Sequence, residues 1–113
     1  MTETAASPPA RGIVDGQHPM LAGHFPGHPI VPGAWLLAWI VAAATRRLAG
    51  AATVGAVKRV KFLRPLPPDQ SFDCALDVRA RTESGDGSCD TMRFVVTSAG
   101  ATIAEGSLQL RRQ

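Results

Sequence analysis

The sequence is poor in cysteine, in charged residues and in long apolar runs. Only two of its 113 residues are cysteines, and charged residues make up 19%. If Cys74 and Cys89 lie on the two arms of a hairpin that turns at residues 85–87, their positions in the pairing register differ by about eight residues, or about 26 Å of strand. No disulfide spans that distance. We therefore interpret both cysteines as buried or unreactive thiols rather than as a redox pair.

Long apolar segments and long runs of like charge are also missing. The longest apolar run, Ala34–Ala44, has 11 residues, whereas a membrane helix needs about 20. No basic segment precedes an early apolar stretch, so we expect no secretory signal and a cytoplasmic location. The formal net charge is only +3, and the sequence has no run of five or six like charges. This excludes the usual charge pattern of a nucleic-acid-binding protein and leaves an acidic protein partner open.

The length predicts one domain. A chain of this size buries about two thirds of the surface that its unfolded form exposes, which is enough for one core. The first ten residues, MTETAASPPA, are small, polar and proline-bearing. We expect a flexible tail over 1–10 and a single domain over 11–113, which excludes a multidomain enzyme with its own cofactor domain.

One apolar helix is expected near the middle of the chain. Pro32 suits a first helical turn, Arg46 and Arg47 suit a last turn, and Gly50 suits a C-terminal stop. The uninterrupted apolar run Ala34–Ala44 leaves this helix no water-facing side. We therefore expect the helix to be surrounded by other structure.

The remaining segments are typical of strands. The expected strands lie near Gly12–Val14, at Val54–Leu63, from Phe72 to Ala80, around Met92–Val96 and around Leu108–Leu110. In the third of these, apolar residues alternate with polar ones, which places Phe72, Cys74, Leu76 and Val78 on one inner face. The prolines at 65, 67 and 68 end the preceding strand because proline cannot donate to a ladder. We predict an α+β fold in which an antiparallel meander packs around the helix.

The segment just before the helix carries the clearest chemical pattern, HFPGHPIVPG from His24 to Gly33. Three prolines stiffen the backbone, so His24 can be held beside the start of the helix. A helix N-terminus offers unpaired N–H groups and partial positive charge. A base beside such a site suits reactions that develop charge on a carbonyl oxygen.

This segment resembles the signature of the 3-hydroxyacyl-(acyl-carrier-protein) dehydratases of the hot-dog superfamily, and residues 61–70, KFLRPLPPDQ, resemble their second block. The resemblance implies a hot-dog fold and a pairing of two subunits. It implies water elimination to a trans-2-enoyl thioester, with no redox or organic cofactor. We expect no metal, because three histidines without nearby cysteines or a carboxylate cluster make a poor zinc site. It assigns His24 as the catalytic base and the N–H of Gly33 as the donor to the thioester carbonyl.

The family's catalytic acid lies 14 positions beyond the histidine, and that position here is Ala38. Alanine transfers no proton. Four interpretations stay open: His24 does both jobs, another group replaces the acid, a partner subunit supplies it, or the chain is a weakened or non-catalytic member. The replacement candidates are His28, His18 and Asp69.

Two groups of residues are candidates for binding. The residues expected to line the substrate channel are Phe25, Pro32, Ala34, Trp35, Ala38 and Trp39. The two tryptophans are equally typical of a hydrophobic core. Docking of the carrier protein is expected from Lys58, Arg59, Lys61 and Arg64, which equally suit a solvated strand face. Two other functions compete with the dehydratase: a hot-dog acyl thioesterase, and a non-catalytic acyl-binding subunit of a heterodimer.

Overall fold

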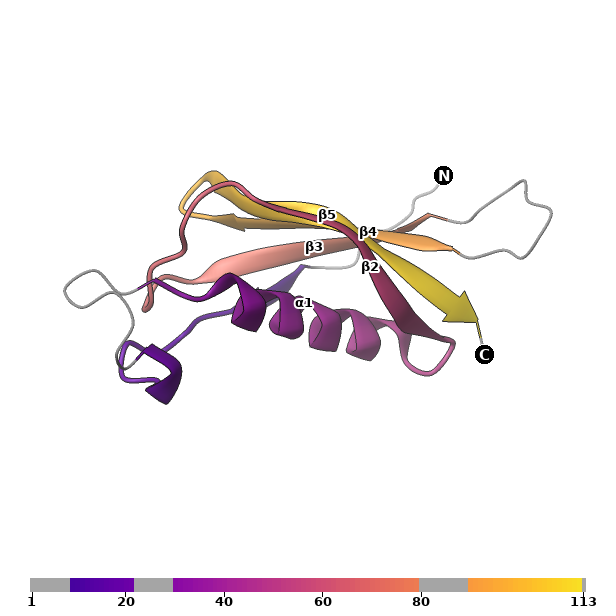
Figure 1. Cartoon of the computed structure of the whole chain (residues 1–113), viewed down its shortest axis with the longest axis horizontal. Coiled ribbons are helices and arrows are strands. Elements are labelled where there is room, and N and C mark those ends of the chain that lie inside the picture. Colours follow the sequence, from indigo (N-terminus) through magenta and orange to yellow (C-terminus); the bar gives the residue numbers. More distant parts are fainter. Residues whose placement is uncertain (1–8, 22–29, 80–89, 113) are drawn as a thin grey trace.

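The computed structural model describes residues 9–21, 30–79 and 90–112, and these form one sheet and one long helix (Figure 1). The elements are β1 (Ala10–Gly12), the 3-10 helix η1 (Pro19–Leu21), α1 (Gly33–Leu48), β2 (Ala52–Phe62), β3 (Phe72–Arg79), β4 (Thr91–Ser98) and β5 (Ala101–Arg112). The predicted order of one strand, one helix and four strands is confirmed. The short η1 turn was not predicted.

The sheet is antiparallel throughout, with the strand order β1-β3-β4-β5-β2. Only β3, β4 and β5 form the predicted meander. The prediction was wrong for β2, which pairs with β5 at the opposite edge from β1. The prolines at 65, 67 and 68 end the pairing with β5 because proline cannot donate to a ladder. The connection then carries the chain past β5 and β4 before β3 begins.

Helix α1 lies along one face of the sheet (Figure 1). It starts after Pro32, and it stops at Ala49 and Gly50, both with positive φ, of 49° and 89°. The sheet covers the side that carries Leu36 and Ile40. The predicted surrounding of the helix is wrong for a single chain, because one sheet covers only one side. The uncovered side exposes Ala34, Ala38, Ala42, Thr45 and Arg46.

Side chains from both layers form the core. The largest fully buried ones are Phe72, Phe94, Leu36, Ile40, Leu66, Met92, Leu108 and Leu110. They confirm the inner faces predicted for β3, β4 and β5, with one exception. Val78 is 48% exposed, because β1 pairs only with residues 72–74 and leaves the second half of β3 as an edge of the described sheet.

Cys74 is fully buried on the inner face of β3. Burial raises the pKa of its thiol to about 12, against a smaller opposite effect of Arg47. The thiol is therefore protonated at neutral pH, as predicted for a buried, unreactive cysteine. Cys89 lies outside the described residues. Within the described part of the chain, no helix is long and apolar enough to cross a membrane.

Candidate active site

The start of α1 has no side-chain cap. Pro32 is the N-cap residue and makes no side-chain hydrogen bond. The first hydrogen bond of the helix runs from the N–H of Leu36 to the carbonyl oxygen of Pro32, at 3.1 Å. The N–H groups of Gly33, Ala34 and Trp35 come before it and donate to no acceptor among the described residues. Together with the helix dipole, they favour an oxygen atom that carries negative charge.

A cavity of about 250 Å³ lies beside this helix start. Two short hydrogen bonds hold its walls together. The N–H of Val31 donates to the carbonyl oxygen of Leu66 at 2.8 Å, and the N–H of Leu63 donates to that of Ile103 at 2.7 Å. The cavity is lined by Ile30, Val31, Gly33, Leu36, Phe62, Leu63, Arg64, Pro65, Leu66 and Ile103. Its walls are largely apolar, which suits a hydrocarbon chain.

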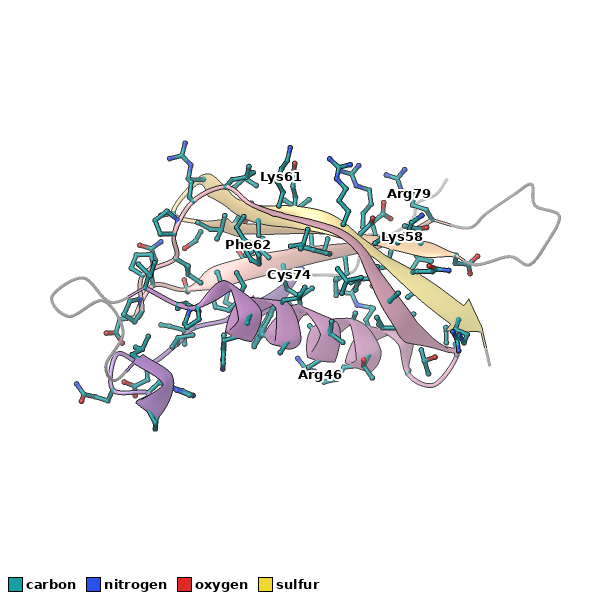
Figure 2. All side chains as sticks on the ribbon, in the orientation of Figure 1. Arg46, Lys58, Lys61, Phe62, Cys74 and Arg79 are labelled. Atoms are coloured by element: carbon teal, nitrogen blue, oxygen red, sulfur yellow. The ribbon has the colours of Figure 1, made fainter. Side chains whose placement is uncertain are left out.

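Phe62 packs directly on Gly33. A Cβ atom at Gly33 would lie 3.1 Å from Cζ of the Phe62 ring, so the ring takes the space that a side chain would need. Phe62 is itself 47% exposed. The ring is therefore a wall between the helix start and solvent. Figure 2 shows Phe62 at the end of β2 that lies nearest this helix start.

The residues predicted to line the substrate channel lie in different places in the structure. Pro32 caps the helix beside the cavity, whereas Ala34 and Ala38 lie on the uncovered side of α1. The two tryptophans are part of the core rather than of the cavity wall. The Trp35 ring meets His18 edge to face at 6.1 Å, and the Trp39 ring meets Phe72 at 4.8 Å. His24, Phe25 and His28 lie outside the described residues.

Ala38 does not face the cavity of its own chain. Ala38 follows Gly33 by five positions in the helix. This corresponds to a rotation of about 140° around the helix axis and an advance of about 7.5 Å along it. Leu36 lines the cavity, and Ala38 is exposed. A proton-transferring group on this side of α1 would therefore not face the cavity of its own chain.

Two of the candidate replacement acids have structural contacts. His18 packs on Trp35, and its carbonyl oxygen accepts a hydrogen bond from the N–H of Leu21 at 2.9 Å. The carboxylate of Asp69 accepts a hydrogen bond from the N–H of Gly16 at 2.9 Å, and Asp69 has a φ of 63°. Neither residue lines the cavity.

The four predicted basic docking residues differ in which hollows they line. Arg64 lines the cavity and an adjoining surface hollow of about 700 Å³. Arg59 lines a separate hollow of about 380 Å³ between strands. Lys58 and Lys61 are exposed on β2 (Figure 2) and line none of these hollows. Only Arg64 is therefore placed to meet a ligand at the cavity.

Comparison with known protein families decides the relationship. Residues 2–107 match the ApeI-like family, described as ApeI dehydratase. The chain belongs to the ApeI-like dehydratase family. This agrees with the dehydratase relationship that the motif around His24 predicts. None of the curated protein sequences is significantly similar to the chain.

Solved structures share the fold of this ApeI-like chain. The dehydratase heterocomplex ApeI:P from Xenorhabdus doucetiae is 22% identical with a TM-score of 0.67, over 90% of this chain and 84% of that chain. An uncharacterized protein from Erwinia carotovora subsp. atroseptica is 25% identical with a TM-score of 0.63, over 90% and 80%. A thioesterase complexed with coenzyme A and zinc from Thermus thermophilus is 22% identical with a TM-score of 0.67, over 94% and 80%. These similarities confirm the predicted hot-dog fold.

In this ApeI-like chain, several cavity residues were not predicted from the sequence. They are Phe62, Leu63 and Ile103. The match of residues 61–70 to the family's second block was the one available signal for the first two. Among residues 9–21, 30–79 and 90–112, no group of three or more His, Cys, Asp or Glu side chains is placed to hold a metal ion.

Proposed function

We propose that this ApeI-like chain eliminates water from a 3-hydroxyacyl thioester, carried by an acyl carrier protein or by coenzyme A, to give the trans-2-enoyl thioester. The observation that carries the proposal is the apolar cavity at the uncapped start of α1. A thioester carbonyl placed there points at the N–H of Gly33, and its acyl chain follows the apolar wall. This geometry stabilises the charge that develops when a proton leaves C2.

The proposed reaction needs one base and one proton donor. His24 takes the proton from C2, the C2–C3 double bond forms, and the C3 hydroxyl leaves as water after it gains a proton. With alanine at position 38, we assign both transfers to His24, which receives the first proton and passes it to the leaving hydroxyl. No external oxidant or reductant takes part.

We also propose that two hot-dog chains pair, as homodimer or heterodimer. The outer edge of β2 has no strand partner among the described residues, and the side of α1 with Ala34, Ala38 and Ala42 is uncovered. A second chain against these surfaces would shield both. The ApeI:P structure is a dehydratase heterocomplex, which supports pairing in this fold.

Hydration of a short trans-2-enoyl thioester, the reverse reaction, tests the function. We expect loss of enoyl absorbance by the purified protein without release of free thiol. Thiol release without hydration would contradict the proposal and favour the thioesterase. Absence of both signals would favour the non-catalytic subunit of a heterodimer, for which the missing acid at Ala38 is the supporting observation.

Restoring a carboxylate at position 38 tests the assignment of the proton donor. Ala38 is exposed on α1, so Ala38→Glu fits without disturbing the core. If His24 is limited by its double task, the variant should hydrate the enoyl thioester at least about tenfold faster, because a positioned acid contributes about 10²- to 10⁴-fold. Ala38→Gln, which has a similar size and no acid, is the matched control. Equal or lower activity of Ala38→Glu would mean that the proton donor is not limiting.

Removing the ring beside Gly33 tests the cavity. We expect Phe62→Ala to lower kcat/KM for a short enoyl thioester by about tenfold, because substrate positioning beside the donor is lost. The loss of kcat/KM should be smaller for longer acyl chains, because removing the Phe62 ring widens the cavity. Val57→Ala removes a similarly exposed apolar side chain from the same strand and should leave kcat/KM within about twofold. Equal losses for all chain lengths would place Phe62 outside the acyl site.

A further inference from the structure

The face of the sheet that is turned away from α1, here called the outer face, carries a cluster of cations. Arg59 and Lys61 come from β2, Arg79 from β3 and Arg93 from β4. All four are exposed. Figure 2 shows Lys61 and Arg79 on this side of the sheet, with Arg46 on the far side of α1. The acyl cavity uses none of these four residues.

Strand register aligns two of these arginines across a hydroxyl group. Ser107 of β5 pairs with Arg59 on one side and with Arg93 on the other. Neighbouring strands lie about 4.8 Å apart, so the two arginine backbones are separated by about 10 Å. Both arginines lie on the outer face, on either side of Ser107.

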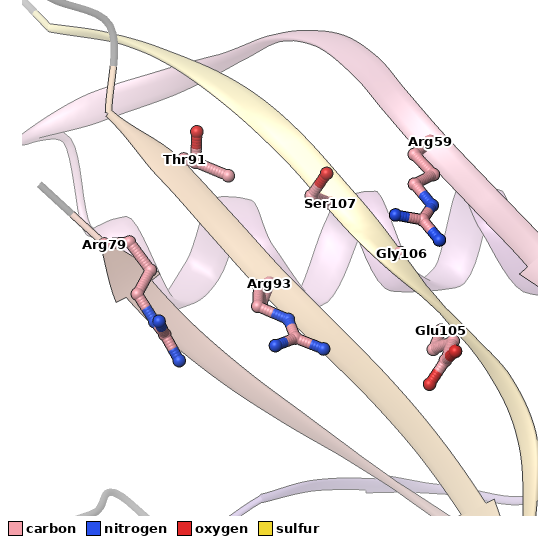
Figure 3. A pocket seen from close by; sticks show the side chains of 7 residues that line it. All are labelled: Arg59, Arg79, Thr91, Arg93, Glu105, Gly106 and Ser107. Carbon is pink, nitrogen blue, oxygen red and sulfur yellow. The ribbon is translucent and has the colours of Figure 1, made fainter. Parts of the chain in front are cut away.

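A hollow of about 380 Å³ lies over this row (Figure 3). Arg79, Thr91, Glu105 and Gly106 complete its lining. Three guanidinium groups face one carboxylate, so the hollow has an excess of positive charge. Its size falls in the range of small-ligand sites.

The arginines of the hollow differ in their partners. Arg79 forms an ion pair with Asp77 at 2.9 Å. Within the part of the chain that the structure describes, neither Arg59 nor Arg93 forms an ion pair with a carboxylate. These two guanidinium groups line the same hollow as the Ser107 and Thr91 hydroxyls, and such hydrogen-bond donors favour an anion.

We propose that this hollow binds the phosphate group of a small molecule, at a site separate from the acyl cavity. The planar guanidinium forks of Arg59 and Arg93 match the oxygen spacing of a phosphate, which accepts two hydrogen bonds from each. The Ser107 hydroxyl donates a further hydrogen bond from below. The excess positive charge of the outer face opposes packing of a second copy on it. The inference does not depend on the dehydratase proposal.

Calorimetric titration with inorganic phosphate and with adenosine monophosphate at low ionic strength tests the site, with adenosine as the ligand lacking phosphate. We expect saturable binding of at least one phosphate probe and none of adenosine. Tighter binding of the nucleotide would identify a phosphate ester as the ligand, and equal binding would identify free phosphate. Both results support the site. Failure of both phosphate probes to bind would overturn it.

Paired variants locate the binding. Arg59→Gln and Arg93→Gln should each weaken phosphate binding at least tenfold. Arg111→Gln removes the same charge from an exposed position near the end of β5, outside the hollow, and should bind as the wild type does. Equal weakening in all three variants would mean diffuse charge attraction and overturn the site, as would unchanged binding in Arg59→Gln and Arg93→Gln. If polyglutamate binds through Arg59 and Arg93 while phosphate does not, the face docks an acidic protein and the proposal is wrong. Thermal melting of each variant checks that it is folded.

Discussion

His24→Ala should lower the rate of enoyl-thioester hydration by about 10³- to 10⁴-fold. A single positioned acid or base contributes about 10²- to 10⁴-fold, and His24 is assigned both proton transfers because Ala38 can make neither. The loss should fall on kcat more than on KM, since the substrate is bound by the apolar cavity and by the N–H of Gly33. Initial rates from enoyl absorbance over a range of substrate concentrations separate the two constants.

His28→Ala is the matched control for this experiment, since His28 lies in the same proline-rich segment. We expect its rate to stay within about threefold of the wild-type rate, as for a substitution away from the reacting atoms. A large loss of rate in His28→Ala with little loss in His24→Ala would mean that His28, and not His24, is the catalytic base. Comparable losses in both would mean that the second histidine supplies the proton for the leaving hydroxyl.

Gly106→Ala should lower the free energy of unfolding by about 3 kcal/mol, the upper part of the usual range for overpacking. A Cβ atom there would contact the backbone carbonyl oxygen of Arg59 and would lie 2.7 Å from Cζ of Phe94. Phe94 is fully buried and the Arg59 carbonyl belongs to the neighbouring strand. Neither can move away without disturbing the β2–β5 pairing or the core.

Urea unfolding and thermal melting measure this effect, which should lower Tm by roughly 10 °C. Gly55→Ala is the matched control on the adjacent strand, because a Cβ atom at Gly55 has no neighbour closer than 3.6 Å. We expect it to change the free energy of unfolding by no more than about 0.5 kcal/mol. Equal stability of Gly106→Ala and the wild type would show that β2 relaxes around an added methyl group.

The local elements and the chemical motif could be predicted from the sequence. Pro32 and Gly50 mark the helix ends because proline suits a first turn and glycine tolerates positive φ. The alternation from Phe72 to Leu76 marks an inner strand face because successive side chains point to opposite sides. The pattern around His24 pointed to a dehydratase, and the family match agrees.

The limits of those predictions have a common cause. Val78 continues the alternation but is exposed, because its burial depends on whether another strand lies beside β3. Ala38 belongs to an apolar run but lies on the uncovered side of α1, because the sheet covers only one side. Periodicity indicates which residues share a face and contains no information about what covers that face.

By itself, the sequence determined the element types, the helix boundaries and the histidine motif, since each depends on residues close together in the chain. The tertiary structure alone decided that β2 pairs with β5, that Phe62 packs on Gly33, and that Arg59 and Arg93 flank Ser107. These contacts join residues far apart in the sequence. Their register depends on how the strands twist and pack over one shared core, which no local pattern specifies.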